Sequence, residues 1–100
     1  MTLRKEVEEL VKIGKLPDSD YATVEWLMRW GGALDAISGP VTEAEALALM
    51  QLFGPDDCFG AVWKLLHLIE TCPAGVPINS KPSPDANEWV QLLWDRSHRE

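Results

Sequence analysis

The stretch 56–71, DDCFGAVWKLLHLIET, decides the fold, because its apolar side chains cover most of the circumference of a helix. When its residues are placed at intervals of about 100°, the polar positions form one narrow strip: Asp57, Gly60, Lys64, His67 and Thr71. A helix that is apolar nearly all round is covered by its neighbours. We therefore expect a bundle of about five helices organised around a central helix over residues 56–71.

Two helices are expected before residue 41. Apolar residues at helical spacing, followed by Gly14 and Pro17, predict an amphipathic helix over residues 2–14. The turn PDSD at 17–20 supplies capping residues for a second helix, which runs through Trp30 and meets Gly31–Gly32. Such a glycine pair bends a helix or lets another backbone approach closely.

Two further helices flank the stretch 56–71. Thr42 and Glu45 have the spacing of a capping box and predict a helix from there to Phe53. The segment 83–88 has a capping serine, a proline and an Asp-x-x-Glu box, which predict a last helix to about Ser97. Prolines and glycine exclude a regular element over 72–82. Because no segment alternates like a half-buried strand, the expected class is all-α, in one domain over residues 1–100.

The sequence predicts a cytoplasmic protein with reduced thiols. It starts with charged residues rather than an apolar leader, and no run of about 18 apolar residues occurs. Cys58 and Cys72 would lie about 21 Å apart on one helix, beyond the reach of a disulfide. We interpret both as buried thiols.

Motifs for catalysis or metal binding are weak. Two His and two Cys residues show none of the spacings of a metal site, so no metal and no cofactor are expected. Asp56–Asp57 is better explained by the dipole of a helix start than as a pair of catalytic carboxylates. His67 fits a half-exposed surface position better than a general base. A pocket near Lys64, His67 and Cys72 is kept as an alternative, but a non-enzyme is favoured.

The negative charge is concentrated in the middle of the chain. The net charge is −7, and residues 18–57 hold eight acidic side chains against one basic side chain, Arg29. Most of these acids stand at expected helix starts, where capping explains them. Capping does not explain why Lys and Arg are nearly absent from this segment. Either the acidic surface is functional, or it serves only to keep the protein soluble. The acidic balance disfavours direct nucleic-acid binding and favours a basic partner.

Tryptophan is the second unusual feature, with five in one hundred residues. On the second helix, Trp26 and Trp30 point about 110 to 150° away from a broader apolar face that includes Tyr21, Val24 and Met28. Either another helix covers the two indoles, or they are exposed as interface anchors. Trp63, Trp89 and Trp94 are expected in the core.

In size, charge and helicity the chain resembles small acidic helical inhibitors, such as bacterial toxin-immunity proteins and nucleic-acid-mimicking inhibitors. The resemblance implies an inhibitor that occludes the surface of a basic toxin or nuclease. The alternative is an adaptor or assembly domain with a homodimer seam or a platform for a partner helix. No membrane partner is expected, and the chain is either a monomer or a homodimer. The candidate partner-binding residues are Asp18, Asp20, Glu25, Trp26, Arg29, Trp30, Asp35, Glu43 and Glu45.

Overall fold

Five α-helices make up the regular structure of the described residues, as the sequence predicts. The computed structural model describes residues 3–55, 58, 60–73, 75–78 and 81–97. The helices are α1 (Lys5–Ile13), α2 (Val24–Asp35), α3 (Glu43–Met50), α4 (Ala61–Ile69) and α5 (Glu88–Ser97). These ranges contain no strand, and the all-α class is confirmed.

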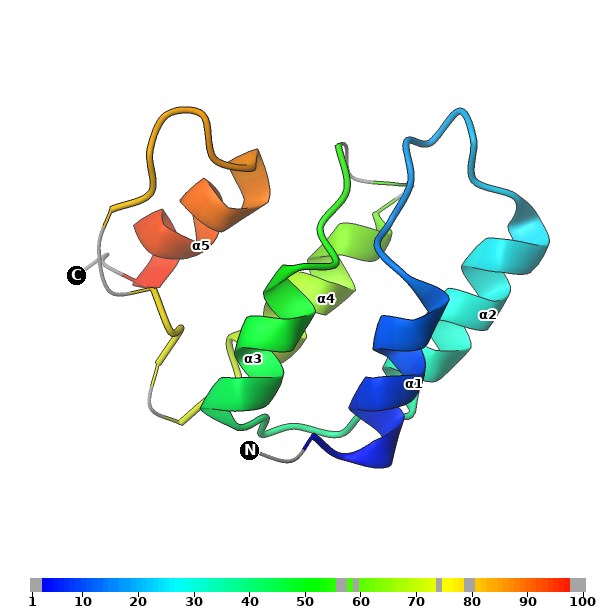
Figure 1. Cartoon of the computed structure of the whole chain (residues 1–100), viewed down its shortest axis with the longest axis horizontal. Coiled ribbons are helices and arrows are strands. Elements are labelled where there is room, and N and C mark those ends of the chain that lie inside the picture. Colours follow the sequence, from blue (N-terminus) through cyan, green and yellow to red (C-terminus); the bar gives the residue numbers. More distant parts are fainter. Residues whose placement is uncertain (1–2, 56–57, 59, 74, 79–80, 98–100) are drawn as a thin grey trace.

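Four of the helices enclose the core, and α5 is added at one side. Helix α1 packs against α2 and α3, and α4 packs against α3 and α2, so the four close a ring. Figure 1 shows α1 and α2 at one side of this ring and α5 at the other, beyond α3 and α4. Within the described part of the chain, no helix covers the face of α2 that points away from the ring.

The capping box of α3 is confirmed and is tied to the start of α1. The Glu45 N–H donates to Thr42 Oγ1 (3.1 Å), and the Thr42 N–H donates to Glu45 Oε1 (2.9 Å). Arg4, directly before α1, donates from Nε to Glu45 Oε2 at 2.8 Å. Its Nη1 also donates to the Ser38 carbonyl at 2.9 Å. One guanidinium thus joins the N-terminal segment, the connection into α3 and α3 itself. This helix ends at Met50 rather than at the predicted Phe53.

The fourth helix is shorter than the predicted range 56–71. It begins at Ala61, because Cys58 and Gly60 have positive φ angles of 45° and 86°, which a right-handed helix excludes. The expected first turn at Asp56 and Asp57 lies outside the described residues. Helix α4 still supplies more buried side chains than any other described helix: Val62, Leu65, Leu66 and Ile69.

The other helix boundaries also differ from the predictions by a few residues. Helix α1 is shorter at both ends than the predicted 2–14. Helix α2 is capped by Thr23, whose hydroxyl accepts from the Trp26 N–H, and it runs through both glycines to Asp35. Helix α5 starts at Glu88, where the side chain of Asn87 accepts from the Trp89 N–H at 2.8 Å. At α2 and α5 a nearer side chain thus satisfies a free N–H group at the helix start, whereas α1 starts without a side-chain cap.

A junction at Gly54 joins three separate segments. The Leu16 N–H donates to the Leu52 carbonyl at 2.9 Å, and Asn87 Nδ2 donates to the Gly54 carbonyl at 3.1 Å. A Cβ at Gly54 would overlap the Leu16 carbonyl oxygen. The absence of a side chain at Gly54 therefore lets the α1–α2 connection lie directly on the segment that follows α3.

The core confirms the expectation for the cysteines but not for Trp63. Cys58 and Cys72 are buried, and no disulfide joins them. Trp89 and Trp94 are half-buried, whereas Trp63 is 39% exposed and meets Trp89 edge to face with ring centroids 5.6 Å apart. The prediction of a core position for Trp63 is wrong, because the face of α4 that carries Trp63, Lys64 and His67 is turned outward.

Candidate protein-binding surface

Helix α2 lies with its tryptophans toward the core. Trp30 is 1% exposed, and its indole N–H donates to the Gly14 carbonyl at 3.2 Å. Trp26 is half-buried and stacks on Trp30 with ring centroids 6.3 Å apart and an interplanar angle of 17°. The two indoles are therefore covered by the rest of the chain rather than exposed, which was one of the two predicted alternatives. The ring of Trp30 is therefore not presented as an exposed interface anchor.

The opposite face of α2 exposes three large apolar side chains. Tyr21, just before the helix, is 81% exposed, Val24 is 73% exposed and Met28 is 72% exposed. Val24 and Met28 are one helical turn apart, so they lie one above the other on the same face. We call Tyr21, Val24 and Met28 the α2 strip.

The orientation of α2 follows the size of its apolar side chains rather than their number. Tyr21, Val24 and Met28 belong to the face that has more apolar residues, and a count of residues points that face inward. An indole, however, removes far more apolar surface from water than Val or Met, and Trp30 also finds a partner for its N–H. The helix therefore turns its tryptophans inward, and the strip remains outside.

Charged residues from the predicted set lie beside the strip. Asp18 closes a turn, because its side chain accepts from the Asp20 N–H at 2.9 Å and its carbonyl accepts from the Tyr21 N–H. Asp20 and Glu25 are exposed, and so is Arg29. This end of α2 therefore combines apolar side chains with three carboxylates and one guanidinium.

Glu43 and Asp35, which were also predicted to bind a partner, do not lie at this end of α2. The connection that leads from α2 to α3, and with it Glu43, lies at the end of the bundle opposite the connection that carries Asp18 and Asp20 (Figure 1). Asp35 lies at the C-terminal end of α2, where its Oδ1 is 4.0 Å from Lys64 Nζ. The structure thus divides the predicted acidic surface between the two ends of α2.

Glu45 is removed from the surface altogether. Its side chain is 1% exposed, whereas that of Arg4 is 36% exposed. The hydrogen bond from the Arg4 guanidinium, with the N–H groups of Thr42 and Arg4, lowers the pKa of Glu45 from about 4.5 to about 2, against the opposing effect of burial. Glu45 is a structural carboxylate, so its predicted place on a partner-binding surface is wrong.

Grooves run along both flanks of α2. Between α1 and α2, a groove of about 400 Å³ is lined by Lys5, Glu6, Glu9, Ala33 and Ala36. Between α2 and α4, two hollows of about 200 and 360 Å³ share Lys64. The exposed face of α2 is therefore a ridge between shallow depressions, into which side chains of a partner could insert.

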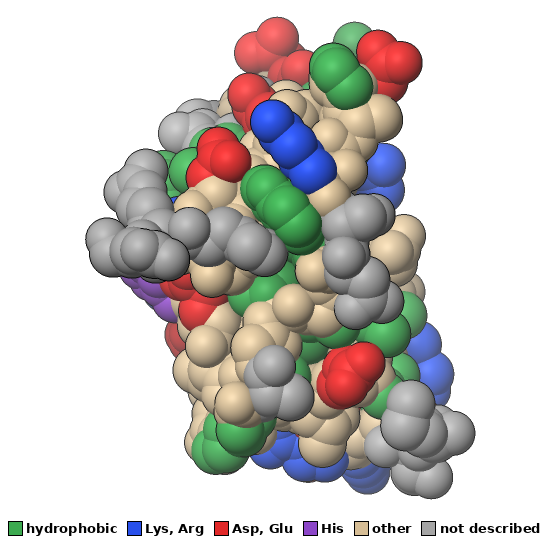
Figure 2. Space-filling model, turned by 90° about the vertical axis from the view of Figure 1, so that its left-hand side faces the viewer, with side chains coloured by type: hydrophobic (Ala, Val, Ile, Leu, Met, Phe, Trp, Pro, Cys, Tyr) green, Lys and Arg blue, Asp and Glu red, His purple; other side chains and the backbone are tan. Residues whose placement is uncertain are grey.

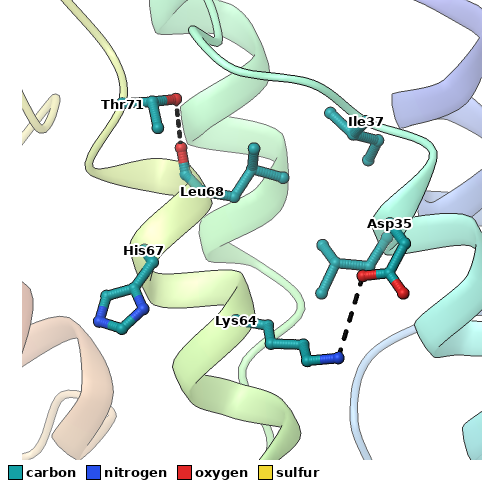
Figure 3. A pocket seen from close by; sticks show the side chains of 7 residues that line it. Asp35, Ile37, Lys64, His67, Leu68 and Thr71 are labelled. Atoms are coloured by element: carbon teal, nitrogen blue, oxygen red, sulfur yellow. Dashed lines mark hydrogen bonds and ion pairs between the residues drawn. The ribbon is translucent and has the colours of Figure 1, made fainter.

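The larger hollow contains part of the alternative pocket predicted near Lys64 and His67. Its apolar floor is Leu34, Ile37 and Leu68, and Figure 3 shows Lys64 reaching across from α4 toward Asp35 while the His67 ring points away from that pair. Cys72 is not among its lining residues. The imidazole is exposed, and the Thr71 hydroxyl that also lines the hollow donates to the Leu68 carbonyl at 2.6 Å and accepts from the Val41 N–H at 3.1 Å.

The described residues offer neither a metal site nor a membrane-spanning helix. His, Cys, Asp and Glu side chains do not form any group of three or more that could hold a metal ion there. None of the described helices combines the length and the apolar character needed to cross a membrane. On the face in Figure 2, which carries α5, acidic and basic side chains are interspersed with hydrophobic ones. The α2 strip therefore stands out as the candidate surface.

Comparisons with protein-family models, with curated proteins and with solved structures found no significant match.

Proposed function

We propose that the protein is a protein-binding domain that acts through the α2 strip. The observation that carries the proposal is the exposure of Val24 and Met28 on one face of α2, together with that of Tyr21 in the turn before the helix. Contiguous apolar side chains rimmed by charged ones are typical of protein interaction sites. The grooves on both flanks of α2 add the relief that shape complementarity needs. This corresponds to an adaptor or assembly domain.

A second candidate is an inhibitor of a basic toxin or nuclease. Asp18, Asp20 and Glu25 support it, because they lie beside the strip and Arg29 is the one basic side chain in residues 18–57. These carboxylates would steer a basic partner toward α2, and the apolar side chains would hold it. The acids at the other end of α2 would not take part in that contact.

Capture with matched variants tests the proposed function. Wild-type protein, the double variant Val24→Gln/Met28→Gln and the control Leu47→Gln are immobilised, and proteins retained from native lysate are identified by mass spectrometry. Leu47 is a suitable control because it is 42% exposed on α3. We expect the same partner on wild type and control and its loss from the double variant. Equal retention by all three proteins would exclude the α2 strip as the binding surface.

A graded salt wash separates the two candidates. A basic partner held by the carboxylates should elute below about 0.5 M salt, because screening removes most of the attraction between exposed charges. A partner held by apolar contacts should stay bound at that salt concentration.

A further inference from the structure

We infer that the partner of the α2 strip is a second copy of this chain, with the two α2 helices packed antiparallel about a twofold axis. This inference rests on the proposed function, because it assigns the occupant of the same surface. In such an isologous pair each residue meets its counterpart across the axis, so the surface must be complementary to itself. Three features of α2 fit that requirement.

The first feature is a self-complementary pair of charges. Glu25 and Arg29 are exposed, opposite in charge and one helical turn apart beside the strip. A twofold axis at the level of Leu27 places Glu25 of one copy level with Arg29 of the other, and the reverse pair follows by symmetry. Both charges then acquire partners, and each copy contributes one of either sign.

The second feature is the apolar strip itself in that register. The pairing of Glu25 with Arg29 fixes the register of the two antiparallel helices. Residues at the same level on the two copies then have numbers that add to about 54. Val24 of one copy and Met28 of the other are then two residues, or about 3 Å, away from the same level, so their side chains interdigitate near the axis. Their side chains, exposed in the single chain, are covered where the two helices are closest.

The third feature is the glycine pair at 31 and 32, which the single chain does not require. Both residues lie inside α2, where each glycine costs roughly 0.5 to 1 kcal/mol relative to alanine. A Cβ at either position would meet nothing within 4 Å, so no contact with the described residues explains the missing side chains. In the proposed register they face the residues that lead into the other copy's α2, and close approach there benefits from glycine.

The acidic charge of the chain does not prevent this pairing. Asp18 and Asp20 of one copy come level with the C-terminal end of the other α2, where Asp35 already faces Lys64 at 4.0 Å. Asp18 and Asp20 therefore lie near an aspartate whose charge Lys64 partly neutralises, at the edge of the contact. Because three apolar side chains per copy make a small interface, we expect a weak, reversible dimer.

Analytical ultracentrifugation over a range of protein concentrations tests the inference. The wild-type mass should rise from 11.2 kDa toward twice that value as the concentration increases. Met28→Glu should abolish the rise, whereas the control Leu47→Glu on α3 should keep it. Circular dichroism on each variant verifies that the helices are retained.

A charge swap tests the antiparallel register. Glu25→Arg and Arg29→Glu should each weaken the dimer about fivefold, because either change places like charges opposite each other twice. The double variant E25R/R29E restores both pairs and should return the dimer to the wild-type affinity. Failure of the double variant to recover would overturn the antiparallel arrangement.

The outcomes also separate this inference from the proposed function. A mass of one chain at every concentration would overturn the second copy as the partner. A different protein captured through Val24 and Met28 would then leave the α2 strip as a binding surface. Loss of both dimerisation and strip-dependent capture would remove the proposed function as well.

Discussion

At the scale of single residues, Glu45 is a carboxylate that the sequence predicts at the surface and the structure buries. A burial that would be costly for a lone carboxylate is compensated by Arg4 and by two backbone N–H groups. The capping-box spacing predicts the hydrogen bond with Thr42, because the two residues are only three apart in the sequence. The bond to Arg4 spans 41 residues, and no local pattern contains it.

Substitution of Glu45 should change the dependence of stability on pH. The folded-state pKa is lowered to about 2, so the carboxylate stabilises the fold fully above its ordinary pKa of about 4.5 and loses this effect as the pH falls toward 2. Glu45→Gln should cost about 2 kcal/mol at neutral pH. Urea unfolding should show the gap to wild type narrowing below about pH 4.5. A gap that stays constant down to pH 3 would contradict the role of the ionised carboxylate.

At the scale of elements, the sequence predicted five helices but not the rotation of α2 or the start of α4. Periodicity identifies a helix from its own residues, and it locates α2 and α4 to within about five residues along the chain. The rotation of α2 depends on Gly14, which accepts from Trp30 across another segment. The start of α4 depends on positive φ angles at Cys58 and Gly60, and the break was concealed because the apolar Cys58 and Phe59 fit the helical wheel.

Two glycine substitutions should have opposite effects on these elements. Gly32→Ala should stabilise the chain by roughly 0.5 to 1 kcal/mol, because the added methyl meets nothing and the backbone is helical. Gly54→Ala should destabilise it by about 2 kcal/mol or more, because the methyl overlaps the Leu16 carbonyl. Thermal unfolding of both variants in parallel measures the two effects. A stabilised Gly54→Ala protein would show that the junction at Leu16 adapts readily.

At the scale of the whole molecule, the candidate site was predictable as a region but not as a set of contacts. The sequence predicted a surface around the second and third helices that included Asp18, Asp20 and Glu25, which do lie beside the strip. It chose Trp26 and Trp30 as anchors, although the exposed apolar residues are Tyr21, Val24 and Met28. Exposure is decided by which face the remaining helices cover, and that is a property of the complete bundle.

The net charge of −7 should make the fold more stable at moderate salt. Self-repulsion among the acids opposes the folded state and is screened over about 10 Å at 0.1 M salt. The pairs Lys12–Glu9 and Lys64–Asp35 are exposed and 4.0 Å long, so their loss by screening is the smaller effect. The melting temperature should therefore rise between about 10 mM and 0.3 M sodium chloride. A fall over this range would indicate that attractive pairs outweigh the repulsion.

The link between Arg4 and Glu45 also bears on the speed of folding. Thr42 and Glu45 can meet as soon as one helical turn forms, whereas Arg4 reaches Glu45 only after a loop of 41 residues has closed. Contacts that form after the rate-limiting step affect unfolding rather than folding. We therefore expect Arg4→Ala to speed unfolding and to leave the folding rate nearly unchanged, which stopped-flow measurement of both rates checks.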